Sequence, residues 1–250
     1  MKTNKRFIVT TALLCMVCVA LQSCIGLSNK KVTIIDKYDH ADQYIAASEG
    51  QATDVKEINI DWIDGDIVVE SYEGDAIAFA EKCDSTLDAK QTLHYWVDNE
   101  GELHIHFAKS GTNVHGLSKK LTIKIPHNFD IHDMEIETVS SDIFLSQAPI
   151  RDIKIETVSG SADINMCDSN TLHPSANMSK EIEMESVSGN MSVSLPKGYP
   201  YSMNFESVSG QASLPSKTFK GMGEHKFNNG VGGVEISAET VSGNLTIKEL

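Results

Sequence analysis

Along most of the chain, apolar residues alternate with polar ones, the period of two that a β-strand shows when one of its faces is buried. The alternation is clearest around a repeated pattern of Glu, Ser or Thr, Val, Ser, and Gly or Ser. In each copy, two apolar residues at alternating positions precede the pattern and two follow it. The copies begin at Glu137, Glu156, Glu185, Glu206 and Glu239. The pattern therefore predicts a repeated unit of strand, corner and strand.

A sixth, degenerate copy lies earlier, from Ile58 to Val69, with Asp61 in the column that elsewhere holds Glu. Glycine occupies the corner in five of the six copies, where it supplies either a positive φ or room for the next unit to approach closely. Because Ser141 stands at that position in one copy, we do not expect a positive φ to be mandatory. The predicted structural corners are Gly65, Gly160, Gly189, Gly210 and Gly243.

The apolar spacing changes at the corner. From Ile136 to Val139 it is three residues, so the alternation slips by one. A bulge or bend near Thr138 is the expected device that keeps both flanking strands facing the core. Two longer intervals between copies, 168–180 and 215–233, are polar or glycine-rich without helical periodicity, and we interpret both as surface loops.

The region before the regular repeats has a different pattern. Alternating residues from Leu93 to Val97 and from Leu103 to Phe107 flank a turn, which predicts a β-hairpin. A further strand spans 121–125 and ends at Pro126. We find no amphipathic helix after the first 23 residues. The sequence therefore predicts an all-β fold, a β-solenoid or β-helix-like stack of repeated units with an antiparallel hairpin region near 91–125.

The first 23 residues predict a targeting segment. Lys2, Lys5 and Arg6 precede an apolar stretch that is too short for a comfortable membrane span. The stretch ends in Leu-Gln-Ser-Cys, which resembles the lipobox of bacterial lipoprotein signal peptides. The resemblance implies cleavage between Ser23 and Cys24 and a lipid on Cys24; the alternative is an ordinary secretory signal with an incidental cysteine. The expected organisation is a signal peptide at 1–23, a lipidated tether at 24–55, and a β-repeat domain at 56–250 with regular repeats from 131.

Charge restricts the partners. The chain carries 35 acidic and 21 basic side chains, a net charge of −14 that would become −17 without the targeting segment. Nucleic acid is an unsuitable partner, because phosphate binding needs clustered Lys and Arg. With two cysteines left after Cys24, Cys83 and Cys167, a disulfide is neither required nor excluded.

The repeated segments and the ending from Phe227 to Ile247 resemble the bacterial putative adhesin family. The resemblance covers roughly residues 58 to 250 and is clearest from 131 onward. It implies a stacked β fold in the cell envelope and an association with adhesion. It supplies no catalytic residues.

Three groups of side chains are candidates for chemistry. The corner serines repeat too regularly for a nucleophile, which is usually singular with a base beside it, so we expect no catalytic residue. His94, His104 and His106 suit zinc in principle, but a solvent-facing side of the hairpin is the favoured interpretation. The column Glu137, Glu156, Glu185, Glu206 and Glu239 would bring carboxylates about 5 Å apart and form a weak cation stripe or, as we favour, a solvated face.

These features favour one function class over two alternatives. The favoured one is a non-enzymatic, lipid-anchored envelope protein of the outer membrane, whose β scaffold binds a surface, a glycan or a protein. It needs no cofactor and no metal. The alternatives are a β-helical polysaccharide lyase or glycosidase, which requires grouped carboxylates in a cleft, and an envelope-stress regulatory component. The sequence leaves the membrane face and the oligomeric state open.

Overall fold

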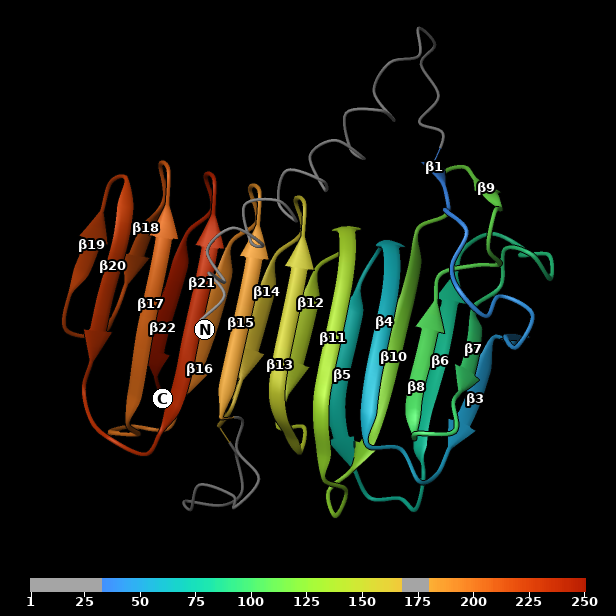
Figure 1. The fold of residues 1–250 in the computed structure, drawn as a ribbon, viewed down its shortest axis with the longest axis horizontal. Helices are drawn as coiled ribbons and strands as arrows, with labels where there is room; N and C mark the ends of the chain where they lie inside the picture. The colour runs from blue at the N-terminus through green and yellow to red at the C-terminus, as the bar shows by residue number, and fades with distance from the viewer. Residues whose placement is uncertain (1–32, 168–179) are drawn as a thin grey trace, which may run out of the picture.

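The computed structural model describes residues 33–167 and 180–250, and this part of the chain is all-β. Two long sheets of ten strands each lie face to face along the whole molecule (Figure 1). We call them the front sheet and the rear sheet, as Figure 1 shows them. No helix occurs in the described ranges, so they contain none that could cross a membrane. The targeting segment and the lipobox lie outside these residues.

The strands of each sheet are ordered along the long axis. The front sheet runs β2 (Ile45–Ala46), β7 (His94–Val97), β8 (Glu102–His106), β4 (Glu57–Asp64), β11 (Ile131–Ser140), β13 (Ile150–Thr157), β15 (Glu181–Ser186), β21 (Val234–Thr240), β17 (Tyr201–Ser207) and β20 (Gly223–Asn228). The rear sheet runs β3 (Glu49–Ala52), β6 (Ile77–Cys83), β10 (Lys119–Pro126), β5 (Ile67–Tyr72), β12 (Ile143–Ser146), β14 (Ala162–Asn165), β16 (Met191–Leu195), β22 (Leu245–Glu249), β18 (Gln211–Ser213) and β19 (Thr218–Lys220). A short separate pair joins β1 (Thr33–Ile34) to β9 (Asn113–Val114).

Each predicted copy contributes one strand to each sheet and a corner between them. The copies stack in parallel and in register, so that Ile136 lies between Ile60 and Ile155, and the sixth copy is confirmed as a full member. The stacking order departs from the chain order. The last copy, β21 and β22, is inserted between the third and the fourth, as Figure 1 shows.

The core lies between the sheets and follows the predicted columns. Ile58, Ile60, Met134 and Ile136 are at most 1% exposed, and the strands after the corners bury their alternating residues in the same way. Burial of these rows of Ile, Val, Leu and Met from both sheets supplies the main stabilising term of the fold. The all-β, solenoid-like fold class is therefore confirmed.

Two local expectations need correction. The alternation slips near Thr138 as expected, and Ile136 and Ile143 on either side of the corner are both buried. The slip falls after Thr138, however, so Thr138 is buried and Val139 is 39% exposed. Residues 215–233 do not form only a loop, because they contain β19 and β20. These strands pair antiparallel with β18 and β17 and close one end of both sheets.

The opposite end of the stack is closed by antiparallel strands and a buried ion pair. The predicted hairpin is formed by β7 and β8, with Tyr95 opposite Ile105. Behind it, Lys119 Nζ lies 2.8 Å from Glu81 Oε2, and both side chains are at most 1% exposed. The ammonium also lies 4.0 Å from the centre of the Phe107 ring. Burial lowers the pKa of Lys119, and Glu81 opposes that change.

Candidate functional site

The corners are built by a buried hydroxyl in the Ser or Thr column. Three residues after each hydroxyl, the corner backbone N–H donates to it. The distance is 3.1 Å at Thr157, 3.0 Å at Ser186 and 2.8 Å at Thr240. These hydroxyls are buried, so they satisfy a backbone donor that would otherwise be unpaired inside the protein. Sequence reasoning did not assign this role, although the column holds only Ser or Thr in five copies.

The corner glycines lie directly against the backbone of the neighbouring copy. A Cβ at Gly189 would stand 1.9 Å from the carbonyl oxygen of Gly160, and one at Gly243 would stand 1.9 Å from that of Gly189. Gly160 and Gly210 have the same kind of contact, and their φ values are not positive. Gly65 is different because it combines the close contact, to Lys119, with a φ of 100°. Close approach, more than turn geometry, therefore requires glycine at most corners.

Four of the five corner serines are engaged with the backbone. Ser159 Oγ donates to the carbonyl of Val139 at 3.2 Å, and Ser188, Ser209 and Ser242 bond the equivalent valine of the neighbouring copy. The contacts of these four are those of corner residues, whereas the hydroxyl of the fifth, Ser140, donates to the Asp64 carboxylate oxygen Oδ1 at 2.8 Å.

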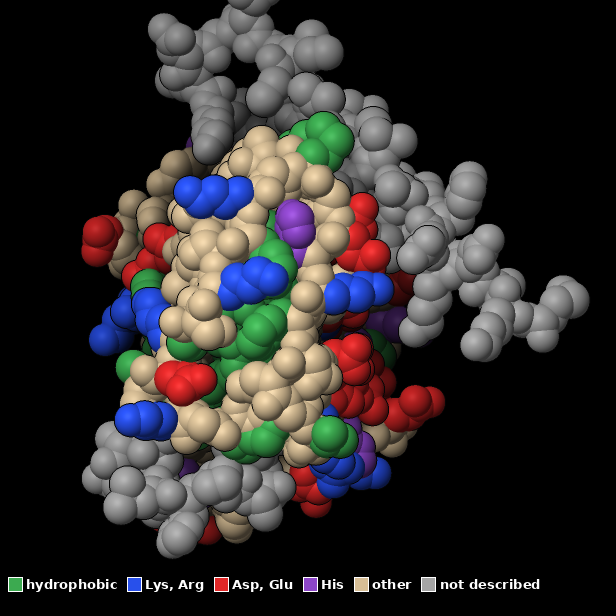
Figure 2. Space-filling model, turned by 90° about the vertical axis from the view of Figure 1, so that its left-hand side faces the viewer, with side chains coloured by type: hydrophobic (Ala, Val, Ile, Leu, Met, Phe, Trp, Pro, Cys, Tyr) green, Lys and Arg blue, Asp and Glu red, His purple; other side chains and the backbone are tan. Residues whose placement is uncertain are grey.

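The acidic ladder is the most regular feature of the outer surface. We use this name for one row of seven carboxylates in register across the front sheet: Asp61, Glu137, Glu156, Glu185, Glu239, Glu206 and Glu224. The spatial order places Glu239 between Glu185 and Glu206, which follows from the inserted last copy. Viewed along the stack in Figure 2, acidic side chains gather on the side that the front sheet faces.

The ladder crowds like charges on adjacent strands. Strands in a sheet are about 4.8 Å apart, where two unit charges repel by about 1 kcal/mol even in water. Loss of solvent, followed by the charges of Glu156 and Glu239, raises the pKa of Glu185 to about 7. Loss of solvent, followed by Asp61 and Glu156, raises the pKa of Glu137 to about 7. Glu137 and Glu185 therefore hold protons near neutral pH that ordinary carboxyl groups would release.

Two lysines partly offset this repulsion, and one of them lies at the end of the row, where Lys226 Nζ is 2.9 Å from Glu224 Oε1. Lys154 Nζ lies 2.6 Å from Glu156 Oε1 and 2.6 Å from Glu135 Oε1 on the neighbouring strand. Glu156 and Glu185 are 8% and 6% exposed, whereas Glu206 is exposed. The column is therefore not uniformly solvated.

The ladder ends at a cluster of aromatic and histidine side chains. Asp61 Oδ2 lies 3.1 Å from His106 Nδ1, and His106 Nε2 lies 2.8 Å from the Tyr44 hydroxyl. Tyr38 stacks on the His106 ring at 4.1 Å. His94 and His106 are each 5% exposed, so the expected solvent-facing side of the hairpin is wrong for both. Tyr38 and Tyr44, from the segment before the hairpin, cover the His106 ring. No local sequence pattern encodes these long-range contacts.

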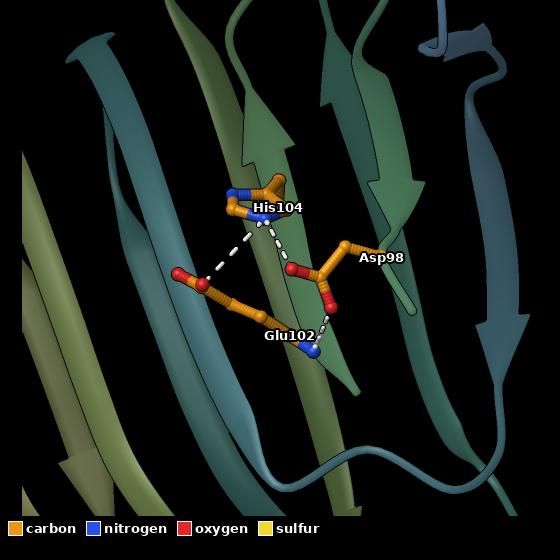
Figure 3. A group of neighbouring side chains, drawn as sticks. All are labelled: Asp98, Glu102 and His104. Carbon is orange, nitrogen blue, oxygen red and sulfur yellow. Dashed lines mark hydrogen bonds and ion pairs between the residues drawn. The ribbon is translucent and has the colours of Figure 1, made fainter. Parts of the chain in front are cut away.

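Beside this cluster, His104 faces two carboxylates. Its Nε2 lies 3.8 Å from Asp98 Oδ2 and 3.7 Å from Glu102 Oε2 (Figure 3). His94 does not join this group, because its Nδ1 is bonded to the Thr92 carbonyl. The three histidines considered together from sequence are thus divided between separate environments. Cys83 and Cys167 are both free thiols, so they do not pair.

Comparison with known proteins agrees with the repeat and the fold. Residues 151–248 match the family described as Toastrack DUF4097. A solved structure of a putative cell adhesion protein from Clostridium sporogenes is similar with a TM-score of 0.61 and 15% identity, over 89% of this chain and 99% of that chain. These findings agree with the expected resemblance to the putative adhesin family, and at 15% identity the structural likeness concerns the fold alone.

Other likenesses are weaker. A putative adhesin from Bacteroides fragilis shares 10% identity over 85% of this chain and 99% of that chain, with a TM-score of 0.30. A putative lipid binding protein from Parabacteroides distasonis shares 13% identity over 85% of this chain and 98% of that chain, with a TM-score of 0.27. No curated protein matches the chain.

Proposed function

We propose that this chain is a non-enzymatic binding scaffold of the bacterial cell envelope, which presents the outer face of the front sheet to a glycan or protein partner. The observation that carries the proposal is the acidic ladder, a row of seven carboxylates held in register across the sheet. A row that repels itself costs stability, and surfaces kept at such a cost are typical of binding sites. The adhesion named for the similar Clostridium sporogenes protein supports the same class of function.

A negative row selects its partners. It attracts basic protein surfaces, or glycans and anionic polymers bridged by divalent cations, and it repels nucleic acid and anionic lipid headgroups. Adhesion that depends on calcium is one form of this function. A binding screen with calcium and a second screen with a chelator separate the two modes.

The test compares the two faces of the molecule. The purified chain is screened against arrays of glycans and matrix proteins, together with two variants that each replace two carboxyl groups with amides. Glu185→Gln/Glu239→Gln alters the ladder, and Glu70→Gln/Asp163→Asn alters the outer face of the rear sheet. We expect the ladder variant to weaken binding at least tenfold and the rear variant less than twofold. Equal effects of the two variants would contradict the assignment of the front face.

We also propose that a lipid on Cys24, after cleavage behind Ser23, holds the scaffold on the outer membrane. A diacylglyceryl group with a further acyl chain provides the two anchoring signals that stable membrane attachment needs. Replacement of Cys24 with Ser is expected to give a soluble or uncleaved form in cell fractionation. A Cys24→Ser protein of mature size that stays with the membranes would refute the anchor.

The acidic ladder also has a feature that the alternative function, a polysaccharide-active enzyme, would require. A carboxyl group with a pKa of about 7, such as that of Glu185, has the protonation state of a general acid, and Glu156 is its neighbour. Arg151, by contrast, is engaged with the exposed Asp130, its Nε donating at 2.8 Å. Incubation with acidic and neutral polysaccharides, followed by a reducing-end assay, tests this alternative. Turnover that disappears in Glu185→Gln would favour the enzyme over the scaffold.

A further inference from the structure

We propose that Asp98, Glu102 and His104 bind one late first-row divalent metal ion, with zinc the best match. The three ligand atoms, one from each side chain, lie within 4.8 Å of one another at the turn end of the β7–β8 hairpin (Figure 3). This proposal is independent of the proposed function, because it concerns a metal ion bound by the hairpin and not a partner bound by the acidic ladder.

The hairpin turn holds Asp98 in the orientation that a metal site needs. One carboxylate oxygen, Oδ1, accepts the backbone N–H groups of Glu100 at 2.8 Å and Glu102 at 2.9 Å. Gly101 closes the turn with a φ of 90°, a conformation that other residues rarely adopt. The second oxygen, Oδ2, is thereby directed towards His104. The backbone thus pre-positions one ligand.

Neighbouring strands fix the imidazole. His104 lies opposite Trp96 in the hairpin, and the two rings stack with their centres 5.1 Å apart and their planes at 16°. The His104 Nε2 atom is buried and has no hydrogen-bond partner. A buried polar atom without a partner is costly. A metal ion bound to the lone pair of this nitrogen would remove that cost.

The distances suit an ion better than hydrogen bonds. Separations of 3.8 Å and 3.7 Å from Nε2 to the carboxylate oxygens exceed the hydrogen-bond range. Two ligands of a tetrahedral zinc ion, each about 2.1 Å from the metal, stand about 3.4 Å apart. A contraction of about 0.3–0.4 Å would bring each nitrogen–oxygen distance to that value, and the two oxygens already lie within 4.8 Å of each other.

Charge and ligand type select the metal. Glu102 lies in register opposite Glu57, so the site sits in a negative neighbourhood that favours a divalent cation. An imidazole nitrogen among the ligands favours zinc, nickel or copper over calcium and magnesium, which prefer oxygen. Three protein ligands leave a fourth position for water or for an oxygen atom of a partner.

Zinc titration of the full chain, without an affinity tag and stripped with a chelator in detergent, tests the site. We expect one saturable zinc site per chain by calorimetry, with an affinity that millimolar calcium does not reduce. His104→Gln and Asp98→Asn are each expected to weaken zinc binding at least tenfold. The asparagine keeps the Oδ1 acceptor of the turn, and His127→Gln, at an exposed position of the same protein, is expected to change the affinity less than twofold.

Cobalt substitution gives an independent measurement. A tetrahedral site with nitrogen and oxygen ligands predicts visible absorption of bound cobalt, which zinc then displaces at one equivalent. Circular dichroism of each variant, compared with the parent, distinguishes loss of the site from loss of the fold. The proposal would be overturned by a folded His104→Gln protein whose zinc affinity is unchanged. It would also be overturned if the parent showed no saturable binding at 100 µM zinc, a concentration about a hundredfold above a micromolar dissociation constant.

Discussion

At the scale of single residues, the repeated pentapeptide is a set of separate structural tasks. The Glu column points outward and builds the acidic ladder, while the Ser or Thr column points inward and holds the corner N–H. The following Ser bonds the neighbouring copy from the outside, and the Gly lets that copy approach. Serine takes part in two of the four tasks. Its buried bond to the corner N–H contributes more to stability than its exposed bond to the neighbouring copy.

We expect that Gly189 cannot be replaced even by alanine without a loss of stability. In Gly189→Ala the new Cβ would stand 1.9 Å from the carbonyl oxygen of Gly160, so one of the two backbones must shift. We expect a loss of about 2–3 kcal/mol in the free energy of unfolding, the range of overpacked sites. Urea denaturation measures it. A change below about 0.5 kcal/mol would show that the corners do not depend on close approach.

Ser186 and Ser188 form a matched pair for the role of the hydroxyls. Ser186→Ala leaves the buried N–H of Gly189 without its acceptor, which costs about 1–3 kcal/mol. Ser188→Ala removes an exposed contact of 3.4 Å to Val158, and we expect a cost of about 0.5 kcal/mol or less. Thermal unfolding of both variants tests the difference. Equal losses would mean that the exposed bond matters as much as the buried one.

At the scale of elements, pairs of strands form a rung, and each end of the stack needs a different closure. The rungs were predictable, because alternation and the repeated columns place Ile58, Met134 and Ile153 in one row. The order of the rungs was not, since similar copies present similar edges and any of them can neighbour another. The strands β19 and β20 escaped prediction because they are short and lie among glycines.

The buried pair Lys119–Glu81 is specific to the first end, and its partners come from the neighbouring strands β10 and β6, which are far apart in the sequence. Lys119→Met would leave the Glu81 carboxylate without its cation in a site that is at most 1% exposed. We expect a loss of about 3–5 kcal/mol in urea unfolding. The double variant Lys119→Met/Glu81→Gln keeps an acceptor for the Leu93 N–H and is expected to recover at least half of that loss. A double variant as unstable as the single one would show that the ammonium matters for its other contacts.

At the scale of the whole molecule, the stack turns a short motif into one long charged surface. The Glu column and its rough spacing could be predicted from the sequence. Its spatial order, the proton affinity of Glu137 and Glu185, and the histidine cluster at its end could not, since they depend on which copies become neighbours. Likewise Asp98 was visible only as a turn residue, because its approach to His104 requires the folded hairpin.

The crowded ladder has a consequence for the pH dependence of stability. A carboxyl group whose pKa is raised from 4.5 to about 7 on folding binds more protons in the native state between these values. The free energy of unfolding contributed by such a group therefore falls as the pH rises from about 5 to 7.5. Other groups also titrate in this interval, so the contribution of the ladder appears only in a comparison with a variant.

The most direct measurement is urea unfolding of the parent and Glu185→Gln proteins at pH 5.5 and pH 7.5, with Glu73→Gln at a 96% exposed position as the control. A neutral amide at position 185 relieves repulsion only where the carboxylate is ionised. We expect Glu185→Gln to be more stable than the parent at pH 7.5, by about 1 kcal/mol, and to differ less at pH 5.5, with no such pattern in the control. A Glu185→Gln protein that is equally or less stable than the parent at pH 7.5 would contradict the account of the acidic ladder as a crowded, self-repelling face.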